Sequence, residues 1–359
     1  MVLAVVTMLS GCGDNKEGPR NDAAVHDTVP HDTGPDKVAR GRYIMNTLGA
    51  CTFCHTPLNA DGSRNTNKLF AGWKCDEATG AFLDVDPDPN VGCLSSRNLT
   101  NDPTGLMNRT DDEIRNAIRN GVRTDGKRLV PVMPYYIFHN MTDDDVDSII
   151  AYLRTVPGVN NLIPANQPPW DDINNEVTTS PLCSGGTCTA TPIPVADIPM
   201  PSAGFADQAS AMRGRYLTGM VGLCIDCHTP DHSDLVGPGQ FPPLFPNPLQ
   251  TTKAFTGGRV FLKEQLGLFS VDYPATVTTR NLTPDATGLM GWTHQQVNDA
   301  IANGKDRQGK AVCAATHGSL ISPYASLEQV DLDDISNYLQ SLAPVVHDTS
   351  PDCQGPMVP

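Results

Sequence analysis

Apolar residues recur at helical spacing in two segments that resemble each other. In residues 110–121, Ile114, Ala117 and Ile118 follow the i, i+3, i+4 pattern of an amphipathic helix. A threonine followed by acidic residues starts this segment, and a glycine ends it. Residues 293–304 also begin with a threonine, have Val297, Ala300 and Ile301 at the same spacing and end in a glycine. The sequence therefore predicts one helix in each segment.

Further helices are predicted on either side of this pair. One begins at the N-capping residue Thr142, and short helices are predicted through Tyr43 and Tyr216. The helix that begins at Thr142 has apolar residues at helical spacing, namely Val146, Ile149, Ile150 and Leu153. Its counterpart in the second of the two similar parts of the chain has Leu332, Ile335 and Leu339. Strand signals are weak, apart from short hairpins predicted near Phe82 and Val260.

Four segments occur twice in the same order, which indicates an internal duplication. The pairs are 40–57 with 213–230, 97–106 with 280–289, 125–128 with 308–311, and 149–157 with 335–343. We call residues 37–160 the first repeat and residues 206–346 the second repeat. Their lengths predict two tandem helical domains. Residues 161–205 are rich in Pro, Asn and Thr and form a predicted linker, and residues 347–359 form a C-terminal tail.

The N-terminus indicates export. Residues 1–11 are an apolar run that ends in Leu-Ser-Gly directly before Cys12, and this resembles the lipobox of bacterial lipoproteins. In such proteins the signal peptide is cleaved before the cysteine, and the thiol carries lipid. An ordinary cleaved export signal is the alternative. Residues 12–36 would then tether the first repeat. Both interpretations place the chain on the periplasmic or cell-surface side, and the lipobox predicts a lipid anchor in a bacterial membrane.

The net charge of the chain bears on which kind of partner it can bind. The chain has 359 residues and a formal net charge of −15. Binding a phosphate backbone needs clustered Lys and Arg, so this charge argues against nucleic acid. It favours neutral or basic proteins as partners.

The cysteine count also fits an oxidising compartment. Of 11 cysteines, four belong to two short motifs and Cys12 is the candidate lipid site, which leaves an even number for disulfides. Proximity favours Cys75–Cys93 and Cys183–Cys188, and Cys313–Cys353 then remains. Other pairings stay open.

The two motifs have the spacing Cys-x-x-Cys-His, which is typical of covalent attachment of a c-type haem. Two thiols add to the haem vinyl groups, and the adjacent histidine binds the iron. A redox dithiol or half of a zinc site is the alternative. The βαβ context of a thioredoxin is missing, and both motifs continue with Thr-Pro, so haem is favoured. The predicted attachment and proximal residues are Cys51, Cys54 and His55, and Cys224, Cys227 and His228.

Both repeats resemble class I c-type cytochromes, specifically the repeats of the cytochrome c subunits of membrane alcohol and sugar dehydrogenases. The resemblance rests on the attachment motifs, on "NLTxDxTG" and on "MPYYIFHNMTDDDVDSIIAYLRTVP", and it covers about 37–160 and 206–346. It implies a mainly α fold in which each of two domains wraps around one covalently bound haem c. It also implies electron transfer as the function, without identifying the partner enzyme.

The resemblance implies a methionine ligand on the distal side of the first haem. In such repeats this ligand is the methionine of a Met-Pro pair before the last helix, which is Met133 here. A thioether opposite a histidine raises the reduction potential. Core packing is the alternative for Met133, and Met141, which competes for the role, is interpreted as packing.

The second repeat lacks this methionine. No methionine lies between Met290 and Met357, and aligning the repeats places His317 in the corresponding window. We therefore predict a bis-histidine haem of lower potential. The alternative is a solvent-facing histidine beside an open or water-ligated iron. His294 and His347 are expected at the surface.

Arg97 and Arg280, each in Arg-Asn-Leu-Thr, are candidates to pair with haem propionates through a bidentate fork. Stabilising a turn is the alternative role. We predict a non-enzymatic carrier of single electrons between redox protein partners, such as a dehydrogenase or another cytochrome. A diheme peroxidase-like enzyme and a haem-based ligand sensor are the competing functions, because both could use an open second haem.

Overall fold

The structure is a computed structural model that describes residues 36–59, 63–74, 94–166, 192–230, 249–262, 276–312, 317, 322–350 and 353–354. The apolar N-terminal run with Cys12, the segment around Phe82 and the side chains of all six candidate disulfide cysteines lie outside these residues. The export signal, the lipid site and the disulfide pairing therefore stay predictions.

The described chain is rich in helix and has few strands, as the sequence predicted. The first repeat contains α1 (Lys37–Asn46), α2 (Cys51–His55), η1 (Thr66–Lys68), α3 (Asp111–Asn120), α4 (Tyr135–Phe138) and α5 (Asp143–Thr155). Between the repeats lies η3 (Val195–Asp197). The second repeat contains α6 (Gln208–Tyr216), η4 (Leu217–Val221), α7 (Cys224–Cys227), η6 (Thr251–Lys253), β1 (Val260–Leu262), β2 (Thr276–Thr278), α8 (His294–Asn303), η8 (Pro323–Ser326) and α9 (Gln329–Ser341), and β3 (Cys353–Gln354) follows it.

Local capping explains why α3 and α8 begin and end where the sequence predicted. The Thr110 hydroxyl accepts from the Glu113 amide, and the Glu113 carboxylate accepts from the Thr110 amide, which completes a capping box. Gly121 ends α3 at a left-handed φ of 62°. Thr293, Gln296 and Gly304 repeat this arrangement at α8. Both helix predictions are confirmed.

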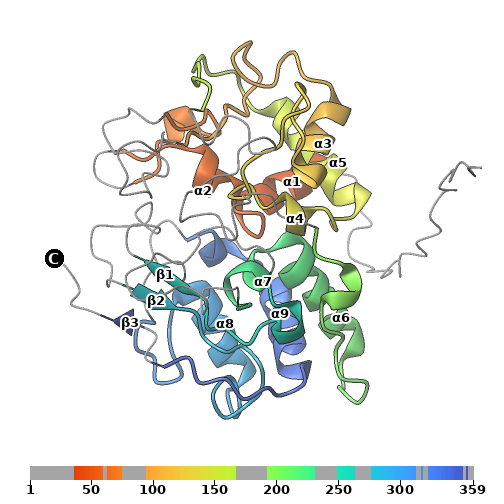
Figure 1. Ribbon diagram of the computed structural model, residues 1–359, viewed down its shortest axis with the longest axis vertical. Coiled ribbons are helices and arrows are strands. Elements are labelled where there is room, and N and C mark those ends of the chain that lie inside the picture. Colours follow the sequence, from red (N-terminus) through yellow and green to blue (C-terminus); the bar gives the residue numbers. More distant parts are fainter. Residues whose placement is uncertain are drawn as a thin grey trace, which may run out of the picture.

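The first and last helices of each repeat cross at close range. α1 packs against α5, and α6 packs against α9 (Figure 1). A Cβ atom at Gly41 would lie 1.9 Å from the Ser148 carbonyl oxygen, and one at Gly214 would lie 2.0 Å from the Asp334 carbonyl oxygen. Only glycine permits these crossings.

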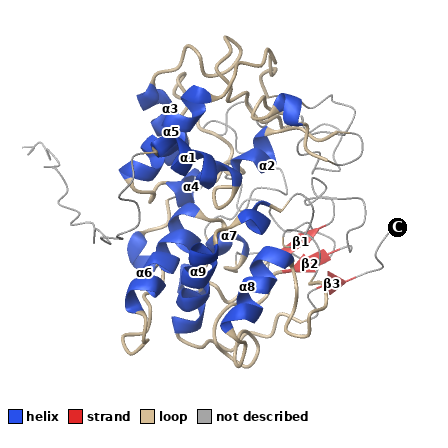
Figure 2. Ribbon diagram, turned by 180° about the vertical axis from the view of Figure 1, so that it is seen from behind, coloured by secondary structure: helices blue, strands red, loops and turns tan. Residues whose placement is uncertain are grey.

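A small antiparallel sheet belongs to the second repeat. Val260 of β1 pairs with Thr278 of β2, which confirms the hairpin predicted there. β2 also pairs with β3, so part of the predicted tail joins the sheet. This sheet lies at one side of the molecule, away from the α6–α9 pair (Figure 2). A two-residue strand is too short to leave a recognisable pattern in the sequence.

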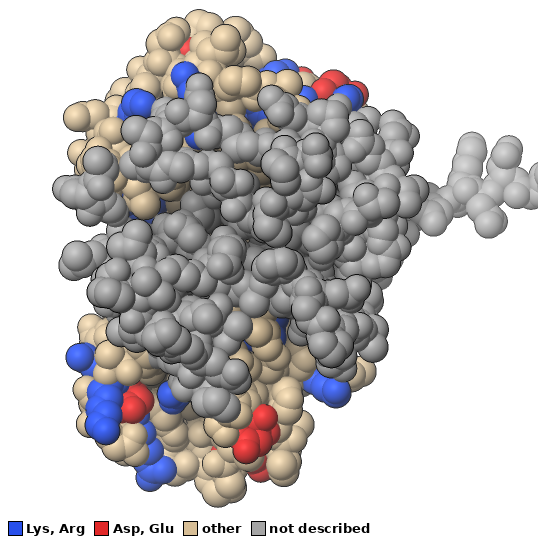
Figure 3. Space-filling view, turned by 60° about the vertical axis from the view of Figure 1, so that its left-hand side comes forward, with Lys and Arg blue, Asp and Glu red and all other residues tan. Residues whose placement is uncertain are grey.

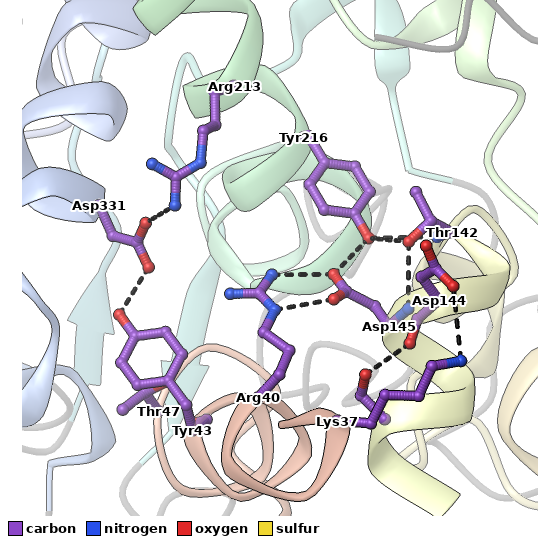
Figure 4. Close-up of polar contacts among 11 residues, drawn as sticks. Lys37, Arg40, Tyr43, Thr47, Thr142, Asp144, Asp145, Arg213, Tyr216 and Asp331 are labelled. Carbon is purple, nitrogen blue, oxygen red and sulfur yellow. Dashed lines mark hydrogen bonds and ion pairs between the residues drawn. The ribbon is translucent and has the colours of Figure 1, made fainter. Parts of the chain in front are cut away.

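The two repeats contact each other through reciprocal hydrogen bonds (Figure 4). The Tyr43 hydroxyl on α1 donates to Asp331 of α9 at 2.6 Å, and the Tyr216 hydroxyl on α6 donates to Asp145 of α5 at 2.6 Å. The same tyrosine oxygens accept from backbone amides before those helices, Glu328 and Thr142 respectively. Tyr43 and Tyr216 are equivalent in the two repeats, and so are Asp145 and Asp331. The contact is therefore isologous, like that of a two-fold dimer.

An arginine of each repeat holds the same carboxylates in place. Arg40 binds Asp145 through Nε at 2.8 Å and Nη2 at 2.9 Å, and the equivalent Arg213 binds both Asp331 and Asp334. These aspartates are largely buried. A buried carboxylate paired with a bidentate arginine has a fixed orientation, so each tyrosine meets a pre-positioned acceptor.

No helix among the described residues is both long and apolar enough to cross a membrane. On the face drawn in Figure 3, the described surface is mainly uncharged, and its Lys and Arg side chains lie in small separate groups. The described part of this face therefore lacks the broad basic surface that a nucleic-acid partner would need.

Candidate functional site

The two Cys-x-x-Cys-His motifs form short helical turns in the structure. Cys51, Cys54 and His55 lie on α2, and Cys224 and Cys227 lie on α7, with His228 directly after it. Ala50, immediately before α2, has a left-handed φ of 50°. Each turn places both thiols and the imidazole on one short segment, as covalent haem attachment requires.

The four thiols are unlike those of a redox dithiol. Burial raises the pKa of Cys54 to about 11 and that of Cys51, Cys224 and Cys227 to about 12. Reactive dithiols have lowered thiol pKa values. A zinc site is also disfavoured, because nowhere in the described ranges do three or more His, Cys, Asp or Glu side chains form a group that could hold a metal ion. Buried thiols with raised pKa values agree with the haem prediction.

The histidine of each motif is held by a backbone carbonyl. His55 Nδ1 lies 2.8 Å from the Arg97 oxygen, and His228 Nδ1 lies 2.8 Å from the Arg280 oxygen. A carbonyl can only accept, so Nδ1 carries the proton and Nε2 keeps its lone pair for a metal. Burial lowers the pKa of both rings, that of His228 to about 4, which keeps them neutral.

The residues of "NLTxDxTG" shape the turn that presents these carbonyls. Asn98 accepts from the Thr100 amide and donates to the Val159 carbonyl oxygen at 2.9 Å. In the second repeat, Asn281 makes the same bonds to Thr283 and Val345. Both asparagines are almost completely buried. The repeated motif thus fixes the position of the residue before it, which is the arginine whose carbonyl holds the histidine.

His317 faces His228 in the second repeat. The two ring centres are 6.3 Å apart, with 51° between the ring planes. Two imidazoles that bind one metal ion from opposite sides, each through a nitrogen about 2 Å from the ion, have ring centres roughly 6 to 6.5 Å apart. The observed separation therefore fits an iron bound between the two rings.

The tautomer and orientation of His317 are fixed as well. His317 Nδ1 lies 3.0 Å from the Ile301 carbonyl oxygen, and its ring stacks on Tyr324 with centres 5.1 Å apart. Burial lowers the pKa of His317, so the ring is neutral. The same hydrogen-bond pattern as at His55 and His228 leaves Nε2 of His317 free for a metal.

His317 does not occupy the place of Met133. Met133 precedes Pro134 and α4, and the residue that precedes Pro323 and η8 in the second repeat is Ser322. The offset between the repeats grows from 183 at the pair Arg128 and Ala311 to 189 at the two prolines. The sequence around His317, before the short helix, is thus longer in the second repeat than in the first.

Met133 lies in the turn that leads into α4. It is half-buried against the hydrophobic core, and its carbonyl oxygen accepts from the Tyr135 amide at 2.7 Å. Met141 is buried within the core, which agrees with its interpretation as packing.

Arg97 stabilises a neighbouring segment and has one donor left over. Its Nη1 donates to the Pro164 oxygen at 2.6 Å and to the Ile163 oxygen at 3.3 Å, so it stabilises the adjacent segment. Its Nη2 is buried, and no described residue accepts a hydrogen bond from it. This donor is suited to an anionic group such as a propionate. For Arg280, the described contact at this site is made by its carbonyl oxygen.

Some polar contacts had no distinguishing signal in the sequence. His294 and His347, expected at the surface, are half-buried, and His347 Nδ1 lies 3.0 Å from the Thr256 oxygen. Asp226, between the two cysteines of the second motif, accepts from Tyr136 of the first repeat at 2.7 Å and from Arg259 at 2.7 Å. These contacts join segments far apart in the chain, so only the fold reveals them.

The sequence is similar to those of several known proteins. No family model matches the chain. The cytochrome c subunit of a quinone alcohol dehydrogenase from Gluconacetobacter polyoxogenes is 27% identical over 313 residues, which is 86% of this chain and 56% of the relative. The chain is homologous to cytochrome c subunits of dehydrogenases.

Shorter matches agree with this relationship. The fructose dehydrogenase cytochrome subunit of Gluconobacter japonicus is 27% identical over 249 residues, covering 66% of this chain and 42% of the relative. A diheme cytochrome c-type protein of Cereibacter sphaeroides is 28% identical over 137 residues, covering 36% and 39%. The chain spans about half the length of the alcohol dehydrogenase subunit. The helix-rich fold is consistent with a cytochrome c type.

Proposed function

We propose that this chain is an electron-transfer protein that binds two haem c groups, one in each of two cytochrome c-type domains. The observation that supports it most is the repeated arrangement of two cysteines and a histidine whose Nδ1 is held by a carbonyl. The homology to cytochrome c subunits supports an electron-carrier role.

His55 and Met133 would bind the iron of the first haem, and His228 and His317 would bind the iron of the second. Cys51 and Cys54 would hold the first covalently, and Cys224 and Cys227 the second. Arg97 Nη2 is the proposed propionate donor. A thioether ligand raises the potential relative to a second imidazole, so the first haem is proposed to have the higher potential.

The bound group supplies one-electron chemistry, and the chain's own residues position it and tune it. The carbonyl oxygens of Arg97, Arg280 and Ile301 fix the tautomers of the three histidines. Burial keeps these imidazoles neutral and able to bind a metal. Because Tyr324 and Ile301 hold His317 in place, the second iron would have two strong ligands. This disfavours the peroxidase-like and sensor alternatives, which need an open position.

We further propose that the chain is exported, lipid-anchored through Cys12, and accepts electrons from the catalytic subunit of a dehydrogenase. The names of the homologues support the partner class, and the apolar run before Cys12 supports the anchor. Replacing Cys12 by alanine is expected to move the protein from the membrane fraction to the soluble fraction.

Haem stoichiometry tests the proposal directly. The intact mass of the purified chain should exceed the polypeptide mass by two haem groups and remain so after denaturation. The double variants Cys51→Ala/Cys54→Ala and Cys224→Ala/Cys227→Ala should each retain one covalent haem. A chain without covalent haem would contradict the proposed function.

A further inference from the structure

An arginine lies against each attachment motif, but the two arginines come from different positions in the repeats. Arg64 Nη1 lies 2.7 Å from the Thr52 oxygen and 3.0 Å from the Phe53 oxygen. Its guanidinium carbon lies 4.8 Å from the centre of the Phe53 ring. The guanidinium group is therefore held at the carbonyl groups of the two residues that separate the cysteines of α2.

Arg259 takes the corresponding place at the second motif. Its Nη1 lies 3.1 Å from the Asp226 carbonyl oxygen, and its guanidinium carbon lies 4.7 Å from the centre of the Phe261 ring. The side chain is 2% exposed. It reaches the motif from β1's N-terminal side, whereas Arg64 follows its own motif closely in sequence.

The two sites differ in the residue between the cysteines. Phe53 and Asp226 are equivalent positions of the repeats. Arg259 forms an ion pair with the Asp226 carboxylate at 2.7 Å. Within the described part of the chain, Arg64 has no carboxylate partner, and an aromatic ring faces it instead. Among the described residues, the first site thus has a positive charge without a carboxylate partner, and the second has an arginine paired with a carboxylate.

We propose that this difference in charge is a second device that separates the two haem potentials: Arg64 raises the potential of the first haem, and Asp226 cancels the same effect of Arg259 at the second. This inference rests on the proposed function, and it assigns tuning roles to residues that bind neither iron. The charge difference and the difference between the methionine and histidine ligands would both give the first haem the higher potential. Electron transfer from the second haem to the first would therefore be favourable.

The physical reason is electrostatic. Reduction adds one negative charge at the iron, so a fixed cation nearby stabilises the reduced state. Arg64 is largely withdrawn from water, and burial lowers its pKa to about 10, so it remains charged at neutral pH. At an effective dielectric constant of about 20, a unit charge roughly 10 Å away changes the reduction equilibrium by about tenfold. For a one-electron couple, tenfold is about 59 mV.

The test is a potentiometric titration of the holoprotein and its variants, with spectra that assign each step to one haem. Arg64→Gln should lower the midpoint potential of the first haem by the equivalent of about a tenfold change in its reduction equilibrium constant. The midpoint potential of the second haem should stay unchanged. Arg64→Lys should retain most of the wild-type potential of the first haem. Asp226→Asn keeps an oxygen acceptor for Tyr136 and should raise the second midpoint by a similar factor. Arg42→Gln removes an exposed charge of the first repeat and serves as the matched control, with both midpoints unmoved.

Equal shifts in Arg64→Gln and Arg64→Lys would show that the guanidinium only supports the α2 carbonyls, and the inference would be overturned. An unmoved second midpoint in Asp226→Asn would overturn it too, and this variant decides the matter alone if Arg64→Gln does not fold. Failure of the proposed function would look different, because the wild-type chain itself would then lack two separate one-electron steps.

Discussion

At the scale of single residues, three histidines are held in the same way by backbone carbonyl groups. His55, His228 and His317 each place Nδ1 within 3.0 Å of a backbone carbonyl oxygen, and burial lowers the pKa of each ring. The proton is therefore fixed on the side away from the proposed metal. The geometry of His317 matches that of the other two histidines, although no motif comparable to the Met-Pro pair of the first repeat marks it in the sequence.

Replacing His317 by alanine tests that membership. We expect the second haem to change from low-spin to high-spin, because one of its two strong ligands is lost, while the first haem keeps its spectrum. Low-temperature EPR of the oxidised protein measures this. His294→Ala is the matched control, since His294 is half-buried on α8 and has no proposed ligand role. A low-spin second haem in His317→Ala would remove His317 from the ligand set.

At the scale of elements, the glycine crossings set how closely the terminal helices of each repeat approach. A Cβ at Gly41 would lie 1.9 Å from a carbonyl oxygen of α5, which no small adjustment of a side chain can relieve. The two helices must move apart, and the packing around them loosens. The crossing therefore depends on one residue in each pair of helices.

Gly41→Ala should consequently destabilise the fold by about 1 to 3 kcal/mol, as overpacking does. Alanine normally stabilises a helix relative to glycine by about 1 kcal/mol, so the expected sign is opposite to helix propensity. Chemical denaturation of the holoprotein measures the difference. Gly204→Ala is the control, because a Cβ there meets nothing within 4 Å and stability should not change. An unaltered midpoint for Gly41→Ala would contradict the close crossing.

Elements with local signals were predictable from the sequence, and those fixed by distant contacts were not. Threonine caps and glycine ends marked α3 and α8 because capping involves neighbouring residues. The sequence before Pro323 has no periodicity, so the alignment placed the Met133 equivalent at 316–319 rather than at Ser322. The histidine-holding groups of Arg97 and Arg280 are backbone carbonyls, which every residue has, and sequence patterns therefore favoured their side chains instead.

At the scale of the whole molecule, the two repeats associate through equivalent surfaces. Tyr43 reaches Asp331 of the other repeat, and Tyr216 reaches Asp145 in return (Figure 4). In the sequence these residues look like ordinary polar positions on helices. The reciprocal contact fixes how the two proposed haem sites lie relative to each other, since the helices that bear the tyrosines lead directly into the attachment motifs.

The interface tyrosines predict a loss of stability at alkaline pH. Burial, together with the facing carboxylates, raises the pKa of Tyr43 and Tyr216. A raised pKa means that the folded state holds the proton more tightly than the unfolded state. The contribution is complete below the unfolded value of about 10 and declines as pH rises above it. Denaturant midpoints should therefore fall as the pH rises above about 10.

The double variant Tyr43→Phe/Tyr216→Phe should show a smaller alkaline decline, because the titrating hydroxyls are gone. At pH 8 it should be less stable by about 1 kcal/mol per lost hydrogen bond. Tyr152→Phe is the matched control and should keep the wild-type pH dependence. If the double variant kept it too, the reciprocal contact would not be a source of stability.

The most direct test of the central claim is a redox titration of the purified holoprotein followed by low-temperature EPR. Two haems with the proposed ligands predict two low-spin ferric signals that disappear in separate one-electron steps, the bis-histidine signal at the lower potential. A high-spin ferric signal from the second site in the resting protein would contradict ligation by His317 and favour peroxidase or sensor chemistry instead.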